Sequence, residues 1–329
     1  MEKEISQDTF KRNAFDHHDS GVVLLFALLV PFIVSYLMAT VADMIASNNT
    51  DITSEMIKSG IAFNIIQAVL LLASYLAVWF FYSKHNKIPY RAISLKPKQS
   101  WKDYLLVVGL AFVLVFGMQY LVQAFDWVLE TIGYPVEKGL GQSTPTSVGG
   151  YFYALFALGI VPAIGEELIF RGIVLNGMRQ RFSTTKAVLL SAALFMLFHG
   201  NLQQLIYPFV LGVVLGFVFV RTGSLMLSII LHLTNNFIVI TCTFIESMTG
   251  FSFALENTWW LVLVGVACAA ATIAICFIVD KFRFKHKDKE EIKPTTERLS
   301  RYFIVAIMVC LALFVLSIGI QFIDPKTLS

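Results

Sequence analysis

Charged side chains occur inside an apolar stretch of this 329-residue chain. The segment VPAIGEELIFRG, residues 161–172, carries Glu166, Glu167 and Arg171 among hydrophobic residues. A charge at the centre of a bilayer costs roughly 2.5–3.5 kcal/mol even on the lenient insertion scale, and such residues usually pair with one another or face a water-filled cavity. These three residues are therefore candidates for chemistry within a membrane.

The spacing of the three charged residues predicts different roles for the two glutamates. Glu167 and Arg171 are four residues apart, so on a helix they share a face and can form an ion pair. Glu166 is rotated by about 100° from Glu167 and has no residue of opposite charge three or four positions away. We predict that Glu167 and Arg171 support the site or the helix packing, whereas Glu166 is available for catalysis.

Two histidines, His199 and His232, also lie in apolar stretches, and Asn236 follows His232 by four residues. A carboxylate beside an imidazole can hold and deprotonate water as a general base. An imidazole and a side-chain amide can donate hydrogen bonds to an oxyanion. Together with Glu166, these groups would suit hydrolysis of a carbonyl compound, with a peptide bond as the natural candidate.

The same residues also fit other roles. A histidine can pack in a helical core, and a histidine with an asparagine can supply hydrogen bonds between membrane helices. Two histidines with a carboxylate could bind zinc as in a His₂Glu site, although the motif H-E-x-x-H is absent. The serine-hydrolase motif G-x-S-x-G is absent as well. The hypothesis that we favour uses neither a metal nor a cofactor.

The composition is that of a polytopic membrane protein. Hydrophobic residues make up 57% of the chain and charged residues only 14%, against about half and a quarter in soluble domains. Segments of about 20 apolar residues can span a bilayer as helices. We predict an all-α membrane bundle of about nine helices, with eight as the alternative because 185–199 is the shortest: 21–43, 60–82, 103–125, 150–174, 185–199, 203–221, 224–246, 258–280 and 302–322.

Helix lengths place the candidate residues at similar depths. Glu166 lies 17 residues before Ser183, and His199 lies 16 residues after it. At 1.5 Å per residue, an antiparallel hairpin that turns at Ser183 brings both to roughly 24–25 Å from the turn. His232 and Asn236 lie at ~13 and ~20 Å along a helix that begins near residue 223. We expect all four side chains to line one cavity.

Two further expectations follow from this alignment. The helix that carries Glu166 must continue past Arg171 to about Gln180. The polar segment HGNLQQ, residues 199–204, can be the rim of a hydrated cavity or a simple external loop. Phe195 lies one helical turn before His199 and is expected to pack beside the cavity.

The Lys and Arg residues of the loops predict the orientation. Loop 84–102 carries six of them and the linker 281–301 carries eight, whereas 47–59 and 126–149 each carry one. Basic loops stay in the cytoplasm, and nine spans with a cytoplasmic N-terminus place all base-rich loops on that side. We expect an integral, multi-pass protein of a bacterial plasma membrane.

The helices also suggest an organisation of the chain. We expect a cytoplasmic tail at 1–20, accessory helices within 21–148, a catalytic core at 149–247 and two C-terminal helices within 248–329. The short turns inside 149–247 imply antiparallel neighbours and hence one compact bundle.

The three motifs, taken in order, resemble a known family. Glu166-Glu167-x-x-x-Arg171, Phe195-x-x-x-His199 and His232-x-x-x-Asn236 are similar to the pattern of the CAAX proteases and bacteriocin-processing proteins. This group, abbreviated CPBP, is also called the Abi family of intramembrane glutamic endopeptidases. The resemblance covers about 149–247, a third of the chain.

This resemblance implies a role for each matching residue. Glu166 and His199 would activate the water, while His232 and Asn236 would stabilise the oxyanion. Glu167 and Arg171 would support the site. The substrate would be a membrane-associated or hydrophobic peptide or protein, cleaved in peptide maturation or bacteriocin immunity. We expect the lipid bilayer and this substrate as partners, and no nucleic acid.

Two other classes of function are also compatible with the sequence. Several members of the family are scaffolds, so the chain could be a non-catalytic scaffold or immunity protein that binds a partner. A transporter would also carry ionisable groups within the membrane. The absence of recognisable inverted repeats disfavours the transporter.

Overall fold

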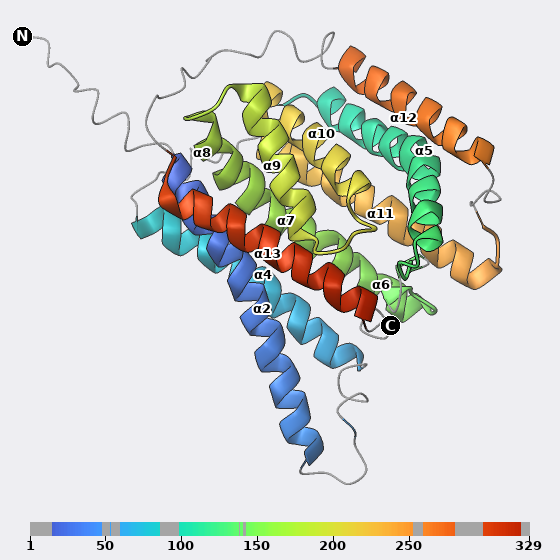
Figure 1. Cartoon of the computed structure of the whole chain (residues 1–329), viewed down its shortest axis with the longest axis horizontal. Helices are drawn as coiled ribbons and strands as arrows, with labels where there is room; N and C mark the ends of the chain where they lie inside the picture. Colours follow the sequence, from blue (N-terminus) through green and yellow to red (C-terminus); the bar gives the residue numbers. More distant parts are fainter. Residues whose placement is uncertain are drawn as a thin grey trace, which may run out of the picture.

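The computed structural model describes residues 15–47, 53, 60–85, 99–137, 139–140, 143–252, 259–279 and 299–323. Within these ranges the chain is helical and has no strand (Figure 1). The predicted all-α membrane bundle is therefore confirmed. The helices are α2 (His17–Ser47), α4 (Ile61–His85), α5 (Trp101–Thr131), a continuous helix from Val148 to Arg179, α9 (Thr184–Phe198), α10 (Ile206–Thr222), α11 (Leu225–Thr249), α12 (Trp259–Val279) and α13 (Arg301–Ile323).

Seven of these helices are long and apolar enough to cross a membrane, whereas α9 and α10 are shorter. With 15 and 17 residues, α9 and α10 measure about 22 and 26 Å, less than the ~30 Å of a hydrocarbon core. The end of α10 and the start of α9 lie at the same end of the bundle. The polar segment 199–205 joins these helices at their other ends.

The helix from Val148 to Arg179 contains two π-helical segments. It consists of α6 (Val148–Ala154), the π-helical η3 (Leu155–Ile160), α7 (Val161–Glu167), the π-helical η4 (Leu168–Leu175) and α8 (Asn176–Arg179). Pro162, near the start of α7, has no N–H and cannot complete the regular hydrogen-bond ladder. Short π-helical turns are frequent at functional sites. As predicted, this helix extends past Arg171, and it ends at Arg179.

Glycines allow the flanking helices to approach one another closely. A Cβ on Gly21 of α2 would lie 2.3 Å from the backbone nitrogen of Phe303 in α13, and a Cβ on Gly265 of α12 would lie 2.8 Å from the backbone of Leu121 in α5. Small residues bring helix backbones together where lipid supplies no hydrophobic driving force. The pairs α2–α13 and α5–α12 thus pack through backbone contact, and Figure 1 shows α12 beside α5 at the edge of the bundle.

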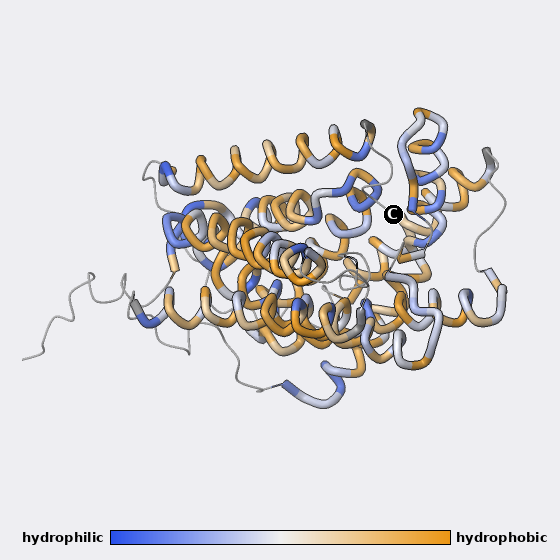
Figure 2. Tube along the Cα trace, turned by 90° about the horizontal axis from the view of Figure 1, so that it is seen from below, coloured by the Kyte–Doolittle hydropathy of each residue, from blue (hydrophilic) through white to orange (hydrophobic). Residues whose placement is uncertain are grey.

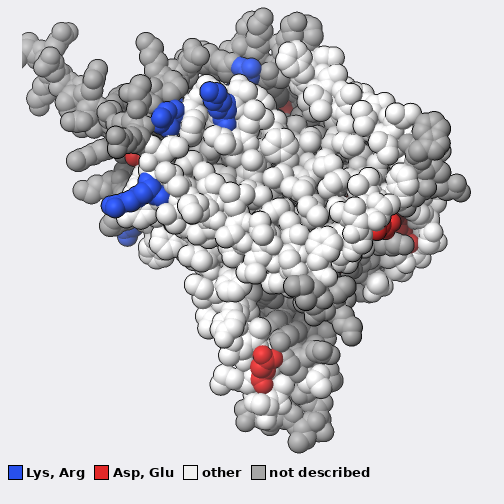
Figure 3. Space-filling view, viewed as in Figure 1, with Lys and Arg blue, Asp and Glu red and all other residues white. Residues whose placement is uncertain are grey.

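Hydropathy and charge both vary along the direction in which the helices run. Hydrophobic residues run along the helices, and hydrophilic residues gather mainly at the helix ends (Figure 2). Lys and Arg cluster at one end of the face seen in Figure 3, where only small acidic areas show. Among the described residues, every Lys and Arg except the buried Arg171 lies in or next to the terminal turns at this basic end, namely Lys84, Lys102, Arg179, Arg181, Lys186, Arg221 and Arg301.

Candidate functional site

A cavity of about 790 Å³ lies between α4, α5, the helix from Val148 to Arg179, α10 and α11. Glu166, His199, His232 and Asn236 all line it, and Phe195 lines it as well. The four residues that the sequence predicted to converge therefore share one cavity. Glu167 and Arg171 are not part of the lining, since both are almost completely buried behind it.

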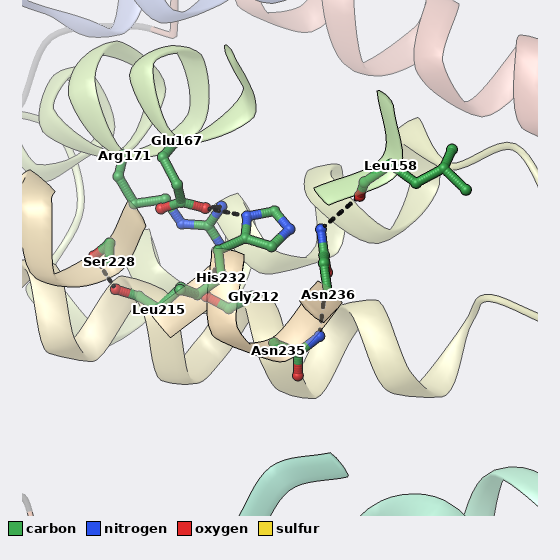
Figure 4. Close-up of polar contacts among 9 residues, drawn as sticks. All are labelled: Leu158, Glu167, Arg171, Gly212, Leu215, Ser228, His232, Asn235 and Asn236. Carbon is green, nitrogen blue, oxygen red and sulfur yellow. Dashed lines mark hydrogen bonds and ion pairs between the residues drawn. The ribbon is translucent and has the colours of Figure 1, made fainter. Parts of the chain in front are cut away.

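Glu167 is the centre of a buried ionic cluster. Its Oε1 atom accepts a hydrogen bond from Arg171 Nη1 at 2.7 Å and another from His232 Nδ1 at 3.0 Å. Figure 4 shows the carboxylate reaching His232 on the neighbouring helix. The predicted ion pair between Glu167 and Arg171 is confirmed, and the structure adds His232 as its third member. Because Nδ1 of His232 donates to a carboxylate, Nε2 is the ring nitrogen left for a ligand.

Arg171 is fixed from two other directions. Its Nη2 atom donates to the carbonyl oxygen of Gly212 in α10 at 3.2 Å, and its guanidinium lies 4.6 Å from the centre of the Phe195 ring. Phe195 is 1% exposed and also contacts the rings of His199 and His232, at centroid distances of 4.8 and 5.9 Å. Phe195 thus separates the buried charges from His199 and holds both imidazoles in place.

The geometry at the end of α9 determines which ring nitrogen of His199 carries the proton. The backbone N–H of His199 bonds to Met196, and Gly200 adopts a left-handed conformation with φ +62°. The carbonyl oxygen of Phe195 therefore has no backbone N–H from residue 199, and His199 Nδ1 lies 2.8 Å from it. A carbonyl only accepts, so Nδ1 carries the proton. In the neutral ring, Nε2 then has a free lone pair that can accept a hydrogen bond from water.

Asn236 also donates to the backbone of the helix that carries Glu166. Leu158 lies in the π-helical η3 and precedes Pro162 by four residues, so its carbonyl has no partner in the α-helical register. Asn236 Nδ2 donates to this carbonyl at 3.0 Å (Figure 4). Its Oδ1 atom accepts from Asn235 Nδ2 at 3.3 Å. One Nδ2–H of Asn236 is thus used for structure, and the second is the one that could serve a ligand.

Glu166 differs from its neighbour Glu167. Its Oε2 atom is buried and has no hydrogen-bond partner among the residues that the structure describes. Tyr75 of α4 lines the same cavity and interacts electrostatically with Glu166. A carboxylate oxygen without a protein partner that borders a cavity is suited to hold water.

The segment HGNLQQ forms part of the cavity wall. His199, Asn201, Gln203 and Gln204 line the cavity, which agrees with the predicted rim and not with a simple external loop. Gln203 Nε2 donates to Asp126 at 3.1 Å and to the carbonyl of Glu137 at 2.9 Å. The later part of α5 and the segment that follows it therefore hold the rim at this end of the bundle.

The sequence missed several residues of the cavity. Asn235 is buried and accepts a hydrogen bond from the hydroxyl of Tyr207, and both residues line the cavity. Asn235 adjoins Asn236, so its polar side chain in an apolar helix was the available signal. Tyr75 gave no signal, because a tyrosine is a common residue of membrane helices and its position depends on how α4 packs.

Two observations bear on other ligands. Within the described ranges, no group of three or more His, Cys, Asp or Glu side chains is arranged to hold a metal ion. A second hollow, of about 750 Å³, lies between α2 and α4 and has a mostly apolar lining that includes His18 and Tyr82. None of the predicted site residues borders that second hollow.

Comparisons with known proteins give a match for the segment that carries the candidate site. A protein of Escherichia coli described as "Uncharacterized 24.3 kDa protein" is 27% identical over 187 residues, which cover 53% of this chain and 85% of the relative. No solved structure matches the chain. Residues 148–238 match the family model described as "Type II CAAX prenyl endopeptidase Rce1-like", and this match supports a CAAX-protease-like membrane endopeptidase. The segment contains all seven predicted site residues, so the part of the chain that carries them is similar to the Rce1-like CAAX protease family.

Proposed function

We propose that the chain is a metal-independent intramembrane endopeptidase with its catalytic core at 149–247. The single observation that carries this proposal is that Glu166, His199, His232 and Asn236 line one cavity in the part of the chain that matches the Rce1-like family. The substrate would be a membrane-associated or hydrophobic peptide or protein. Peptide maturation and bacteriocin immunity are the processes that the family resemblance suggests.

The first step would be the activation of water. A water molecule between Glu166 and His199 would donate one hydrogen bond to the Glu166 carboxylate and one to Nε2 of His199. Glu166 would take the proton as the hydroxide attacks the carbonyl carbon of the peptide bond. Both groups border the cavity, and neither the Oε2 atom of Glu166 nor the Nε2 atom of His199 has a protein partner among the described residues.

The developing oxyanion would accept hydrogen bonds from Asn236 and His232. Asn236 would use its second Nδ2–H, and His232 would donate from Nε2 as an imidazolium, which Glu167 stabilises at 3.0 Å. When the C–N bond breaks, Glu166 would return its proton to the leaving amine. Glu167 and Arg171 would then act as positioning residues, because their contacts run through His232 and Phe195.

Purified protein in proteoliposomes tests the proposal. The substrates would be membrane peptides. They are first identified by comparing the peptide termini of cells that have the native protein with those of cells that have Glu166→Gln. Glu166→Gln and His199→Ala should each lower kcat by about 10²–10⁴-fold, since a positioned acid–base group contributes that much. Glu246→Gln is the matched control, because Glu246 lines the same cavity outside the predicted catalytic set.

Two outcomes would contradict this mechanism. Cleavage that chelators abolish, while Glu166→Gln cleaves as well as the parent, would favour the zinc-dependent alternative. Full rescue of a deletion strain by the Glu166→Ala/His199→Ala double variant would favour the non-catalytic scaffold or immunity protein.

A further inference from the structure

The cavity lies towards one end of the bundle. Its lining comes from the later part of α5, the early part of the helix from Val148, the segment between α9 and α10, and the later part of α11, which reaches Glu246. Three lining residues in the connections between helices are exposed and mark its mouth, namely Gly139, Ser143 and Gln204. These connections lie opposite the basic end.

No Lys or Arg of the basic end borders this cavity. The basic end comprises the end of α4, the start of α5, the turn between α8 and α9, the end of α10 and the start of α13. The segments 84–102 and 281–301, which adjoin these helix ends in the sequence, carry six and eight Lys and Arg residues. The basic end and the mouth of the cavity therefore lie at opposite ends of the bundle.

Charge asymmetry of this size sets the orientation of a membrane protein, because Lys- and Arg-rich loops stay in the cytoplasm. We propose that the cavity opens on the extracytoplasmic side of the membrane, so that the peptide enters from outside the cytoplasm. The substrate class is then a polypeptide segment that has already been exported, or the outer flank of a membrane-anchored protein. The side of opening is independent of the proposed function, whereas the substrate class rests on it.

The segment 199–205, which forms the rim of the cavity, lies on the side of the mouth. Ser317 of α13 donates to the carbonyl of Gly200 at 2.6 Å, and Tyr134 accepts from the backbone of Leu202 at 3.2 Å. The rim is therefore held in place, and the peptide would reach His199 past it without crossing the basic end.

Cysteine labelling tests the side of opening without any substrate. In a background with Cys242, Cys268, Cys276 and Cys310 changed to Ser, one cysteine is introduced at Gln204→Cys in the mouth or at Lys186→Cys at the basic end. Lys186 is exposed near the start of α9 and serves as the matched control. Spheroplasts of a bacterial expression host are treated with a membrane-impermeant, permanently charged methanethiosulfonate, and the remaining thiols are counted by the gel shift of a maleimide polymer.

We expect Gln204→Cys to be blocked in intact spheroplasts and Lys186→Cys to be blocked only after permeabilisation. Ser143→Cys repeats the measurement at a second position of the mouth. A variant that keeps only the native Cys242 extends the measurement into the cavity, since Cys242 is part of its lining. The reverse pattern, or reaction of Gln204→Cys and Ser143→Cys only after permeabilisation, would overturn the proposal.

A second experiment tests the substrate class. The same cleavable peptide is fused to either the outer or the inner end of a single-span anchor, and both fusions are expressed with the native protein or with Glu166→Gln. Only the outer fusion should be cleaved, and only by the native protein. Cleavage of the inner fusion alone would overturn the substrate assignment, whereas the expected labelling without cleavage of either fusion would contradict the proposed function and leave the side of opening intact.

Discussion

The core helices, which carry the predicted site residues, and the flanking helices differ in how much they bury and in which side chains they bury. In α11, half of the most apolar 18-residue window is buried, against 11% in α4, 17% in α2 and α12, and 22% in α13. The core buries charged and polar side chains such as Glu167, Arg171 and His232, each of which has a partner from another part of the chain or from the next turn. The flanks pack through glycines and turn large apolar residues outward.

This difference shows where sequence change should matter. When one member of a buried pair in the core is replaced, the other member loses its hydrogen-bond partner. Burial prevents water from taking the place of that partner. A side chain that faces outward from a flanking helix has no such partner. The predictions below test the contrast, from the largest expected effect on the free energy of unfolding to the smallest.

The Arg171→Met variant should cause the largest loss. Removing one partner of a buried pair leaves an uncompensated charge and typically costs ~3–5 kcal/mol. The Glu167→Gln/Arg171→Met double variant should lose less than Arg171→Met alone, because no lone charge then remains. The measurement is unfolding of the purified protein by chemical denaturant in detergent. Equal losses in both variants would show that the pair is not the source of the effect.

The Asn236→Ala variant tests the break in the helix ladder. It removes the side-chain donor of the Leu158 carbonyl and should cost ~1–3 kcal/mol. In a Pro162→Ala background the loss should be smaller, because the introduced alanine supplies a backbone N–H in the same helix. A double-mutant cycle of the same unfolding measurement gives this coupling, and a coupling of zero would contradict the compensating role of Asn236.

The Gly265→Ala variant tests the packing of a flanking pair. Its Cβ would lie 2.8 Å from the backbone of Leu121, so α12 must move away from α5. Overpacking costs ~1–3 kcal/mol, and we expect the lower end because α12 lies at the edge of the bundle. Gly319→Ala in α13 is the control, since no atom lies within 4 Å of its added Cβ. Proteolytic activity should persist in both variants, and a loss in Gly265→Ala alone would tie α12 to the site.

The Phe277→Leu variant should have the smallest effect. Phe277 lies on α12 and is 66% exposed, so the substitution exchanges one apolar outward side chain for another. We expect a change within about 0.5 kcal/mol, as for surface substitutions away from special features. Thermal unfolding in lipid nanodiscs measures it, and a change as large as that of Asn236→Ala would show that the flanks are as specific as the core.

The sequence predicted what depends on periodicity and on spacing along one helix. The helical bundle follows from apolar segments of sufficient length, and the pair of Glu167 and Arg171 follows from a four-residue interval. Counting residues from the turn at Ser183 was enough to predict that Glu166 and His199 share one cavity. These features need only the geometry of a regular helix.

Other features depend on contacts between helices and could not be derived in this way. The bond from His232 to Glu167 requires the rotation of α11 about its axis, which a count of depth leaves undetermined. The π-helical turns shift the register within the helix from Val148 to Arg179. The bond from Asn236 to the carbonyl of Leu158 likewise depends on how α11 packs against the helix from Val148 to Arg179.

The left-handed turn at Gly200 has a consequence for how the protein responds to acid. In many enzymes a carboxylate orients the imidazole, so protonation of that carboxylate can release the ring. Here a peptide carbonyl performs this task for His199, and a peptide carbonyl does not titrate. The orientation of the ring therefore depends on backbone geometry and not on the charge of a neighbouring side chain.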